Sequence, residues 1–229
     1  MIPVYYNSSY VGAAHSFDTT RKAGWIARSL DDDPIDGIEI HSPNSLSAEQ
    51  VSIVHDPAYV RAVETGEPRS LAESQGFPWD PGIWTMVVAS TGGGTHSLIK
   101  VNPRIWQVDV SVDGFDRDTP SERTPLNLVR SADDYLLAID RELSTLERTA
   151  PRFDLCIYNA GMDPYEGCDI GGLSGITLTI LARREMIVFE WCLRRKIPVA
   201  FVLAGGYVGD RLSQEELVLL HRFTIEAAS

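Results

Sequence analysis

The stretch Tyr158-Asn159-Ala160-Gly161-Met162-Asp163-Pro164 decides how this chain is interpreted. It continues the apolar run Phe153-Asp154-Leu155-Cys156-Ile157, and the two together are typical of a buried strand that ends in a carboxylate. Open α/β sheets bind their ligands outside the carboxyl ends of the strands, so Asp163 is predicted to lie where chemistry takes place. A second apolar run, residues 198–204, ends in Gly205-Gly206-Tyr207 and brings a phenol to a strand end.

Further strand and helix patterns surround these two runs. Short strands are predicted at residues 3–6, 37–40 and 104–112, in addition to 153–159 and 199–204. Helical spacing of apolar residues predicts helices over about 23–30, 57–63, 84–90, 131–146, 179–195 and 214–227. Five strands alternating with helices favour an α/β fold with a mainly parallel sheet. The length of 229 residues suits one domain over residues 1–229.

Two segments are predicted to be loops, and one segment is anomalous. Residues 65–82 are rich in Gly, Pro and Ser and carry Phe77, Trp79 and Asp80, while residues 113–127 are polar. Gly92-Gly93-Gly94 interrupts an otherwise helical pattern, and each internal glycine costs a helix about 1 kcal/mol relative to alanine.

Composition excludes several classes of protein. The formal net charge of -12 and the absence of a Lys/Arg cluster disfavour binding to nucleic acid or to an anionic membrane. The three cysteines include no CxxC pair, which predicts buried thiols and a reducing, cytoplasmic compartment. The first residues lack the pattern of a signal peptide, and no apolar run is long enough to span a membrane.

The residues alone leave two interpretations open at each candidate position. Asp163, followed by Asp169, could bind a divalent metal or could cap a turn through its side chain. Tyr207 could be a catalytic phenol or a packed side chain beside a glycine turn. None of the five histidines forms an HxH, HExxH or His-His pair.

Taken together, the chain resembles the zinc-dependent histone deacetylase-like family, which includes the acetylpolyamine amidohydrolases and has the arginase–deacetylase fold. The resemblance runs through nearly the whole sequence. Its most specific part is a set of three segments in a fixed order: Tyr158 to Pro164, Asp169-Ile170-Gly171-Gly172-Leu173, and Leu203-Ala204-Gly205-Gly206-Tyr207. Other matching segments are Pro3-Val4-Tyr5-Tyr6, His15-Ser16-Phe17, Val54 to Val60 and Gly92-Gly93-Gly94-Thr95.

The resemblance implies a three-layer α/β/α fold, shortened to about five strands, and a role for two residues. Asp163 corresponds to a zinc ligand of the family, and Tyr207 corresponds to the tyrosine that polarises the substrate carbonyl and stabilises the oxyanion. The segment with Phe77, Trp79 and Asp80 corresponds to the mouth of the substrate site.

Departures from the family pattern determine the functional expectation. The family's His-His pair, which serves as general base and acid, and its Asp-x-His motif, which supplies two more zinc ligands, are both absent. The glycine-rich segment follows the 84–90 helix directly, which indicates that a long internal block is missing, with the junction near residues 90–93. Catalytic zinc typically needs three protein ligands, so no zinc and no deacetylase activity are expected.

Lost strands would leave sheet edges and apolar faces uncovered, which predicts a homo-oligomer. Two alternatives stay open at this point. One is an active zinc amidohydrolase whose rebuilt site recruits Asp163, Asp169, His96 and Tyr207. The other is a small-molecule binder that uses the loop with Phe77, Trp79 and Asp80.

Overall fold

The computed structural model describes residues 1–13, 21–90, 104–113 and 123–229. The chain divides into two compact units, Met1–Gly92 and Gly93–Ala228. The division falls at the glycine segment that sequence analysis identified as a junction. The prediction of a single domain stays a prediction. Among the described residues, no helix is both long and apolar enough to span a membrane.

The first unit contains one parallel strand pair and mostly short helices. Strand β1 (Ile2–Tyr5) pairs in parallel with β2 (Ile38–His41), in register from Ile2 opposite Ile38 to Tyr5 opposite His41, and α1 (Lys22–Asp32) lies in the connection. The remaining elements are η1 (Ser8–Val11), α2 (Ala48–Val51), α3 (Pro57–Thr65), α4 (Arg69–Ala72) and α5 (Gly82–Ser90).

Capping side chains fix the short helices of this unit. Ser47 and Gln50 form a reciprocal capping box at the start of α2, as the sequence Ser47-Ala48-Glu49-Gln50 indicates. Asp56 accepts hydrogen bonds from the backbone N–H groups of Ala58 and Tyr59 at the start of α3. Gly66 ends α3 in the left-handed conformation, with φ of 81°.

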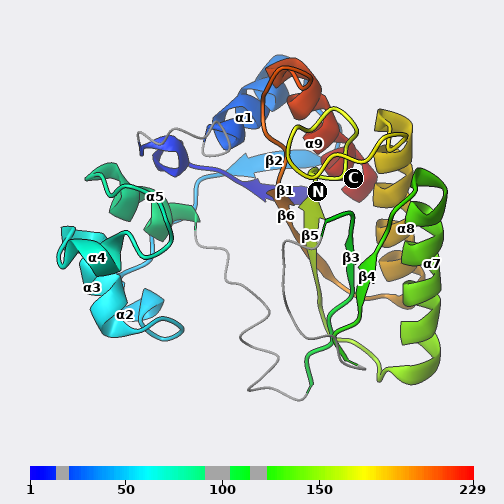
Figure 1. Cartoon of the computed structure of the whole chain (residues 1–229), viewed down its shortest axis with the longest axis horizontal. Coiled ribbons are helices and arrows are strands. Elements are labelled where there is room, and N and C mark those ends of the chain that lie inside the picture. Colours follow the sequence, from blue (N-terminus) through cyan, green and yellow to red (C-terminus); the bar gives the residue numbers. More distant parts are fainter. Residues whose placement is uncertain (14–20, 91–103, 114–122) are drawn as a thin grey trace. The chain divides into compact units, whose positions relative to one another are not determined.

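The second unit contains the remaining strands and the longest helices. Strand β3 (Asp109–Ser111) pairs in parallel with β4 (Leu126–Leu128), and β5 (Cys156–Gly161) pairs in parallel with β6 (Val199–Ala204). Helix α7 (Ala132–Thr149) lies beside α8 (Leu178–Arg195), which connects β5 to β6, and α9 (Gln214–Ala228) also packs against α8 (Figure 1).

Helix α8 covers one face of the β5–β6 pair through aromatic contacts. The ring of Phe189 lies edge-on to Tyr158 of β5 at 5.8 Å and to Phe201 of β6 at 5.5 Å between centroids. These contacts fix the β5–α8–β6 unit and therefore the carboxyl ends of its strands.

The structure confirms an α/β composition with parallel strand pairing, and it corrects several sequence predictions. The strand predicted over residues 104–112 is limited to β3, Asp109–Ser111. Residues 113–127 were predicted to be a loop, yet β4 begins at Leu126. Residues 65–82 were likewise predicted to be a loop, yet they contain the single turn of α4. Three or four residues are too few to show a period, so backbone pairing or packing determines these elements.

Candidate functional site

Asp163 lies directly beyond the carboxyl end of β5, as the sequence predicts. Its Oδ1 accepts a hydrogen bond of 3.0 Å from the backbone N–H of Gly206, which follows β6. The Met162 N–H donates to the carbonyl of Ala204 at 3.0 Å, so the strand pairing extends to the residue before Asp163. The carboxylate therefore joins the ends of the two strands.

Only glycine fits at positions 205 and 206, because the ends of β5 and β6 lie so close together there. Both residues have positive φ, 63° and 74°. A Cβ added at Gly205 would overlap the Oδ2 of Asp163, and one added at Gly206 would overlap the side chain of Leu217. The contacts thus join the Asp163 carboxylate to the glycine turn that follows β6.

Tyr207 follows these glycines and lies in the electrostatic field of Asp163. Burial raises the pKa of the Tyr207 phenol, and the negative charge of Asp163 raises this pKa further. The phenol therefore stays protonated at neutral pH and keeps its O–H donor. The structure brings the two sequence-predicted site residues together.

A buried ionic cluster on α8 binds the last residue of β5. Arg184 of α8 donates to the carbonyl oxygen of Gly161 at 2.6 Å and to the hydroxyl of Tyr135 at 3.1 Å. Its Nε donates to the neighbouring Glu185 at 3.0 Å, and Glu185 is fully buried. Burial acts to lower the pKa of Arg184, but the neighbouring hydroxyl groups of Tyr135 and Tyr158 and the carboxylate of Glu185 outweigh it and raise this pKa.

This cluster was missed in the sequence, although a signal was present. Within α8, Ile180, Ile187, Val188 and Trp191 recur at helical spacing, and Arg184 falls on the same face of the helix. A charged residue on an apolar face indicates a buried partner. Here Glu185 and Gly161 are such partners.

Asp169 serves a different purpose from Asp163. Its Oδ1 accepts a hydrogen bond of 2.9 Å from Nε of Arg211, and its Oδ2 accepts one of 3.2 Å from the N–H of Asp210. Arg211 also donates to the carbonyl oxygens of Glu166 and Cys168. The hydrogen bond from Arg211 is the main reason why the pKa of Asp169 is lowered. Asp169 therefore ties the loop after β5 to the loop after β6.

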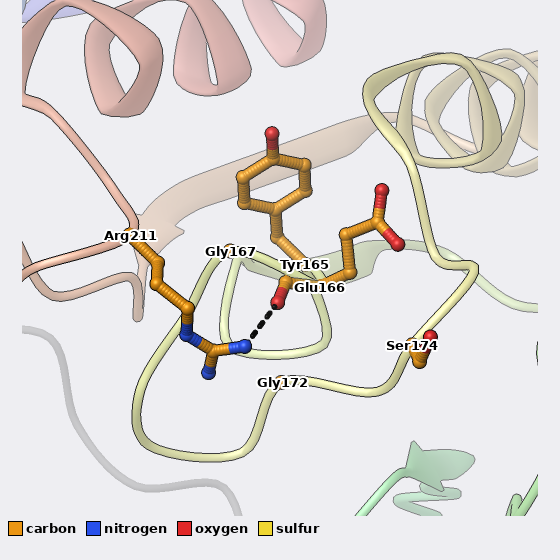
Figure 2. Close-up of a pocket in the computed structure, with 6 residues that line it drawn as sticks. All are labelled: Tyr165, Glu166, Gly167, Gly172, Ser174 and Arg211. Carbon is orange, nitrogen blue, oxygen red and sulfur yellow. Dashed lines mark hydrogen bonds between the residues drawn. The ribbon is translucent and has the colours of Figure 1, made fainter.

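An open pocket of about 500 Å³ lies along this loop. Figure 2 shows Arg211 reaching across it to the Glu166 carbonyl. The Glu166 carboxylate accepts a hydrogen bond of 2.8 Å from the N–H of Gly175. Neither Asp163 nor Tyr207 lines the pocket; its lining residues are Tyr165, Glu166, Gly167, Gly172, Ser174 and Arg211.

The described residues near Asp163 do not fit a zinc site. Asp163 supplies a carboxylate, but Asp169 is paired with Arg211. The thiol of Cys168 donates to the Met162 carbonyl, and burial is the main cause that raises the pKa of this thiol to about 11. No group of three or more His, Cys, Asp or Glu side chains with metal-binding geometry occurs in the described parts of the chain. His96 lies outside the described residues.

The predicted substrate-mouth residues belong to the first unit. The Trp79 indole donates to the Val63 carbonyl at 2.7 Å, and the ring packs against the core of Ala13, Val63 and Ile83. The Asp80 carboxylate accepts from the N–H of Gly82 at 2.7 Å, at the start of α5. Phe77 is 45% exposed. Trp79 and Asp80 thus have structural roles, which the sequence interpretation did not separate from a binding role.

Comparison with known proteins gives a relative without an assigned function. No family model matches the chain. The sequence is similar to an uncharacterized protein of Picosynechococcus sp., with 26% identity over 299 residues that cover 99% of this chain and 98% of the relative. Since this chain has only 229 residues, at least 70 of the 299 aligned positions have no counterpart in it.

Proposed function

We propose that this chain is a shortened, catalytically inactive relative of the histone deacetylase-like zinc amidohydrolases, which self-associates and acts by binding. We also propose that its strand pairs derive from the three-layer α/β/α arginase–deacetylase fold. The observation that carries the proposal is the position of Asp163 and Tyr207 at the ends of β5 and β6, with the carboxylate bonded to Gly206.

Two observations support loss of the catalytic machinery. The sequence has no His-His pair and no Asp-x-His motif, so a general base and two metal ligands of that family have no counterparts. The alignment with the Picosynechococcus protein leaves at least 70 of its 299 positions without residues of this chain, which supports the absence of an internal block.

Metal content and hydrolysis test this proposal together. Purified full-length protein is first dialysed into buffer that contains zinc. Atomic spectroscopy is then expected to find less than one bound zinc ion per chain. Acetyl-lysine peptides and acetylated polyamines should not be hydrolysed, with or without added zinc. Stoichiometric zinc together with turnover that Tyr207→Phe abolishes would overturn the proposal, whereas turnover that survives Tyr207→Phe would identify a contaminant.

A second candidate is an active amidohydrolase with a rebuilt site. The protonated phenol of Tyr207 beside Asp163 favours it, because a phenol O–H is the donor that stabilises an oxyanion. This candidate requires further ligands from elsewhere, such as His96 or another subunit. It predicts that Asp163→Asn removes both bound zinc and turnover, while Asp169→Asn, at the acid that pairs with Arg211, removes neither.

A second copy of the chain is the proposed binding partner. Ile157 of β5 and Val202 of β6 are 58% and 45% exposed, and Leu155, just before β5, is 52% exposed. The strand register places Ile157 and Val202 on the same face of the pair, and in an α/β sheet both faces are normally covered by helices. A face that a missing block once covered can instead be covered by the same face of another subunit.

Sedimentation velocity at micromolar concentration tests self-association. The wild-type protein is expected to form a dimer or a higher oligomer, and Ile157→Lys should shift it toward the monomer. Leu193→Lys, at an apolar position of α8 that is 77% exposed, is the matched control and should leave the oligomer intact. Added salt should favour association because it screens the net charge of -12. A wild-type monomer would contradict the proposal.

A further inference from the structure

Two cysteines, one at the beginning of β5 and one near the end of α8, lie close together without forming a sequence motif. Cys156 is the first residue of β5, and Cys192 lies in the last turns of α8, well separated along the chain. Both residues belong to the second unit. Cys192 is buried, whereas Cys156 is half-buried.

Backbone hydrogen bonds place the two residues beside the same dipeptide. The N–H of Cys156 donates to the carbonyl of Pro198 at 2.9 Å. Ile197 is the residue before Pro198, and its N–H donates to the carbonyl of Cys192 at 3.0 Å. Strand pairing at β5 and the end of α8 thus bring the two cysteines together independently of their side chains.

The side chains meet inside a small apolar cluster. Cys192 lies in a buried group with Trp191 and Ile197, and Cys156 packs against this group. This packing, together with the backbone hydrogen bonds, places the two thiols near each other. A neighbouring pair of thiols, one partly accessible and one enclosed, is the arrangement of an attacking and a resolving cysteine.

We propose that Cys156 and Cys192 form a reversible, intramolecular disulfide when the protein meets hydrogen peroxide. The bond would tie the start of β5 to the end of α8. This site does not depend on the proposed function, because it lies at the amino end of the strand pair that carries Asp163 and Tyr207 at its other end.

The chemistry balances with peroxide as the only oxidant. The Cys156 thiolate attacks one peroxide oxygen, the O–O bond breaks, and the departing hydroxide takes a proton to become water. The Cys156 sulfenic acid then reacts with Cys192: the S–S bond forms, the S–O bond breaks, and the hydroxide leaves as a second water with the Cys192 proton. Two thiols lose two electrons in total, and one peroxide gains them.

Exposure assigns the two roles. Cys156 is half-buried and accessible to peroxide, whereas Cys192 is buried. The neighbouring Cys192 thiol lowers the pKa of Cys156, which favours the thiolate at the accessible position. Cys156 is therefore the attacking thiol and Cys192 the resolving thiol.

Cys168 provides an internal control. It is fully buried beyond the opposite end of β5, its S–H donates to the Met162 carbonyl, and burial raises its pKa to about 11. Peroxide should leave this thiol unmodified under conditions that oxidise the other two.

Peptide mapping of the wild-type protein is the decisive experiment. The reduced full chain is treated with hydrogen peroxide at neutral pH, denatured in an alkylating reagent, and digested with trypsin and a glutamate-specific protease. The second protease is needed because trypsin leaves Cys156 and Cys168 in one peptide, whereas Glu166 lies between them. The expected product is a Cys156–Cys192 cross-linked peptide that reductant cleaves, with Cys168 alkylated.

Variants separate the two steps. Cys168→Ser should form the cross-link at the wild-type rate. Cys192→Ser should stop at the Cys156 sulfenic acid, which a 1,3-dicarbonyl probe traps, and Cys156→Ser should form neither product. Circular dichroism checks that each variant is folded. If a variant does not fold, the peptide map of the wild-type protein alone tests the proposed disulfide. Overoxidised Cys156 with Cys192 still alkylated, or a cross-link that includes Cys168, would overturn the proposal.

Discussion

The two ends of the β5–β6 pair differ in how they are held together. At the carboxyl end, the Asp163 carboxylate bonds to Gly206, and Arg184 binds the Gly161 carbonyl from a fully buried cluster. At the amino end, Cys156 packs against the apolar cluster of Trp191, Cys192 and Ile197, and backbone hydrogen bonds join this end to residues 197 and 198. The same strand pair thus has a polar end and a nearly apolar end.

The difference separates the two proposals made for this chain. The carboxyl end carries Asp163 and Tyr207, on which the proposed relation to zinc amidohydrolases rests, and the Asp163 carboxylate is already bonded within the protein. The amino end carries the two thiols of the proposed disulfide. The two proposals therefore concern opposite ends of one strand pair and can be tested separately.

The largest effect is expected from removing Arg184 at the polar end. Arg184→Met leaves the carboxylate of Glu185 buried without its cation, which should lower the free energy of unfolding by about 3–5 kcal/mol. Urea denaturation measures the loss. Arg183→Met, at the exposed neighbouring arginine, should change stability little. Equal losses in the two variants would show that the buried cluster does not support this end.

Oxidation of the apolar end should have the next largest effect, with the opposite sign. A disulfide between Cys156 and Cys192 closes a long loop and should raise the free energy of unfolding by about 3 kcal/mol relative to the reduced protein. The comparison uses the same protein before and after peroxide treatment, in urea. The gain should vanish in Cys192→Ser and persist in Cys168→Ser. If the gain in stability persists in Cys192→Ser, it comes from another modification and not from the disulfide.

A smaller loss is expected where the carboxylate meets the glycine turn. Gly205→Ala combines a positive φ with overlap between the new Cβ and Asp163, and should destabilise the protein by about 2–3 kcal/mol. Gly37→Ala has a similar φ of 83° but open space around the added Cβ, and should cost only about 1 kcal/mol. If the two losses were equal, the close approach of Asp163 would be absent in solution.

The smallest effect is expected at Asp169, whose carboxylate is exposed and paired with Arg211. Because the folded-state pKa of Asp169 is lowered, its contribution is present above the unfolded-state pKa and is lost as pH falls through the folded-state value. The stability difference between wild type and Asp169→Asn should therefore shrink between about pH 6 and about pH 2. If the stability difference between wild type and Asp169→Asn stays constant over this pH range, the substitution acts through packing and not through the charge of Asp169.

Sequence patterns predicted the long elements well because those elements repeat a period many times. Helices α7, α8 and α9 and strands β5 and β6 were found within a few residues, and the capping signals of α2 and α3 were present in the sequence. Strand β4 and helix α4 were missed because three or four residues carry no period. Pairing and packing with distant residues determine such short elements.

The candidate site divides in the same way. The sequence by itself determined that Asp163 and Tyr207 each follow the end of a strand, because apolar runs followed by glycine turns specify strand ends. Only the tertiary structure decided that the two strands are neighbours and that the Asp163 carboxylate bonds to Gly206. It also decided that Arg184 and Glu185 form a buried pair next to Gly161, and that Cys156 packs against the cluster that contains Cys192. Each of these depends on how α8 packs on the β5–β6 pair, and side-chain chemistry between distant residues follows from that packing rather than from local sequence.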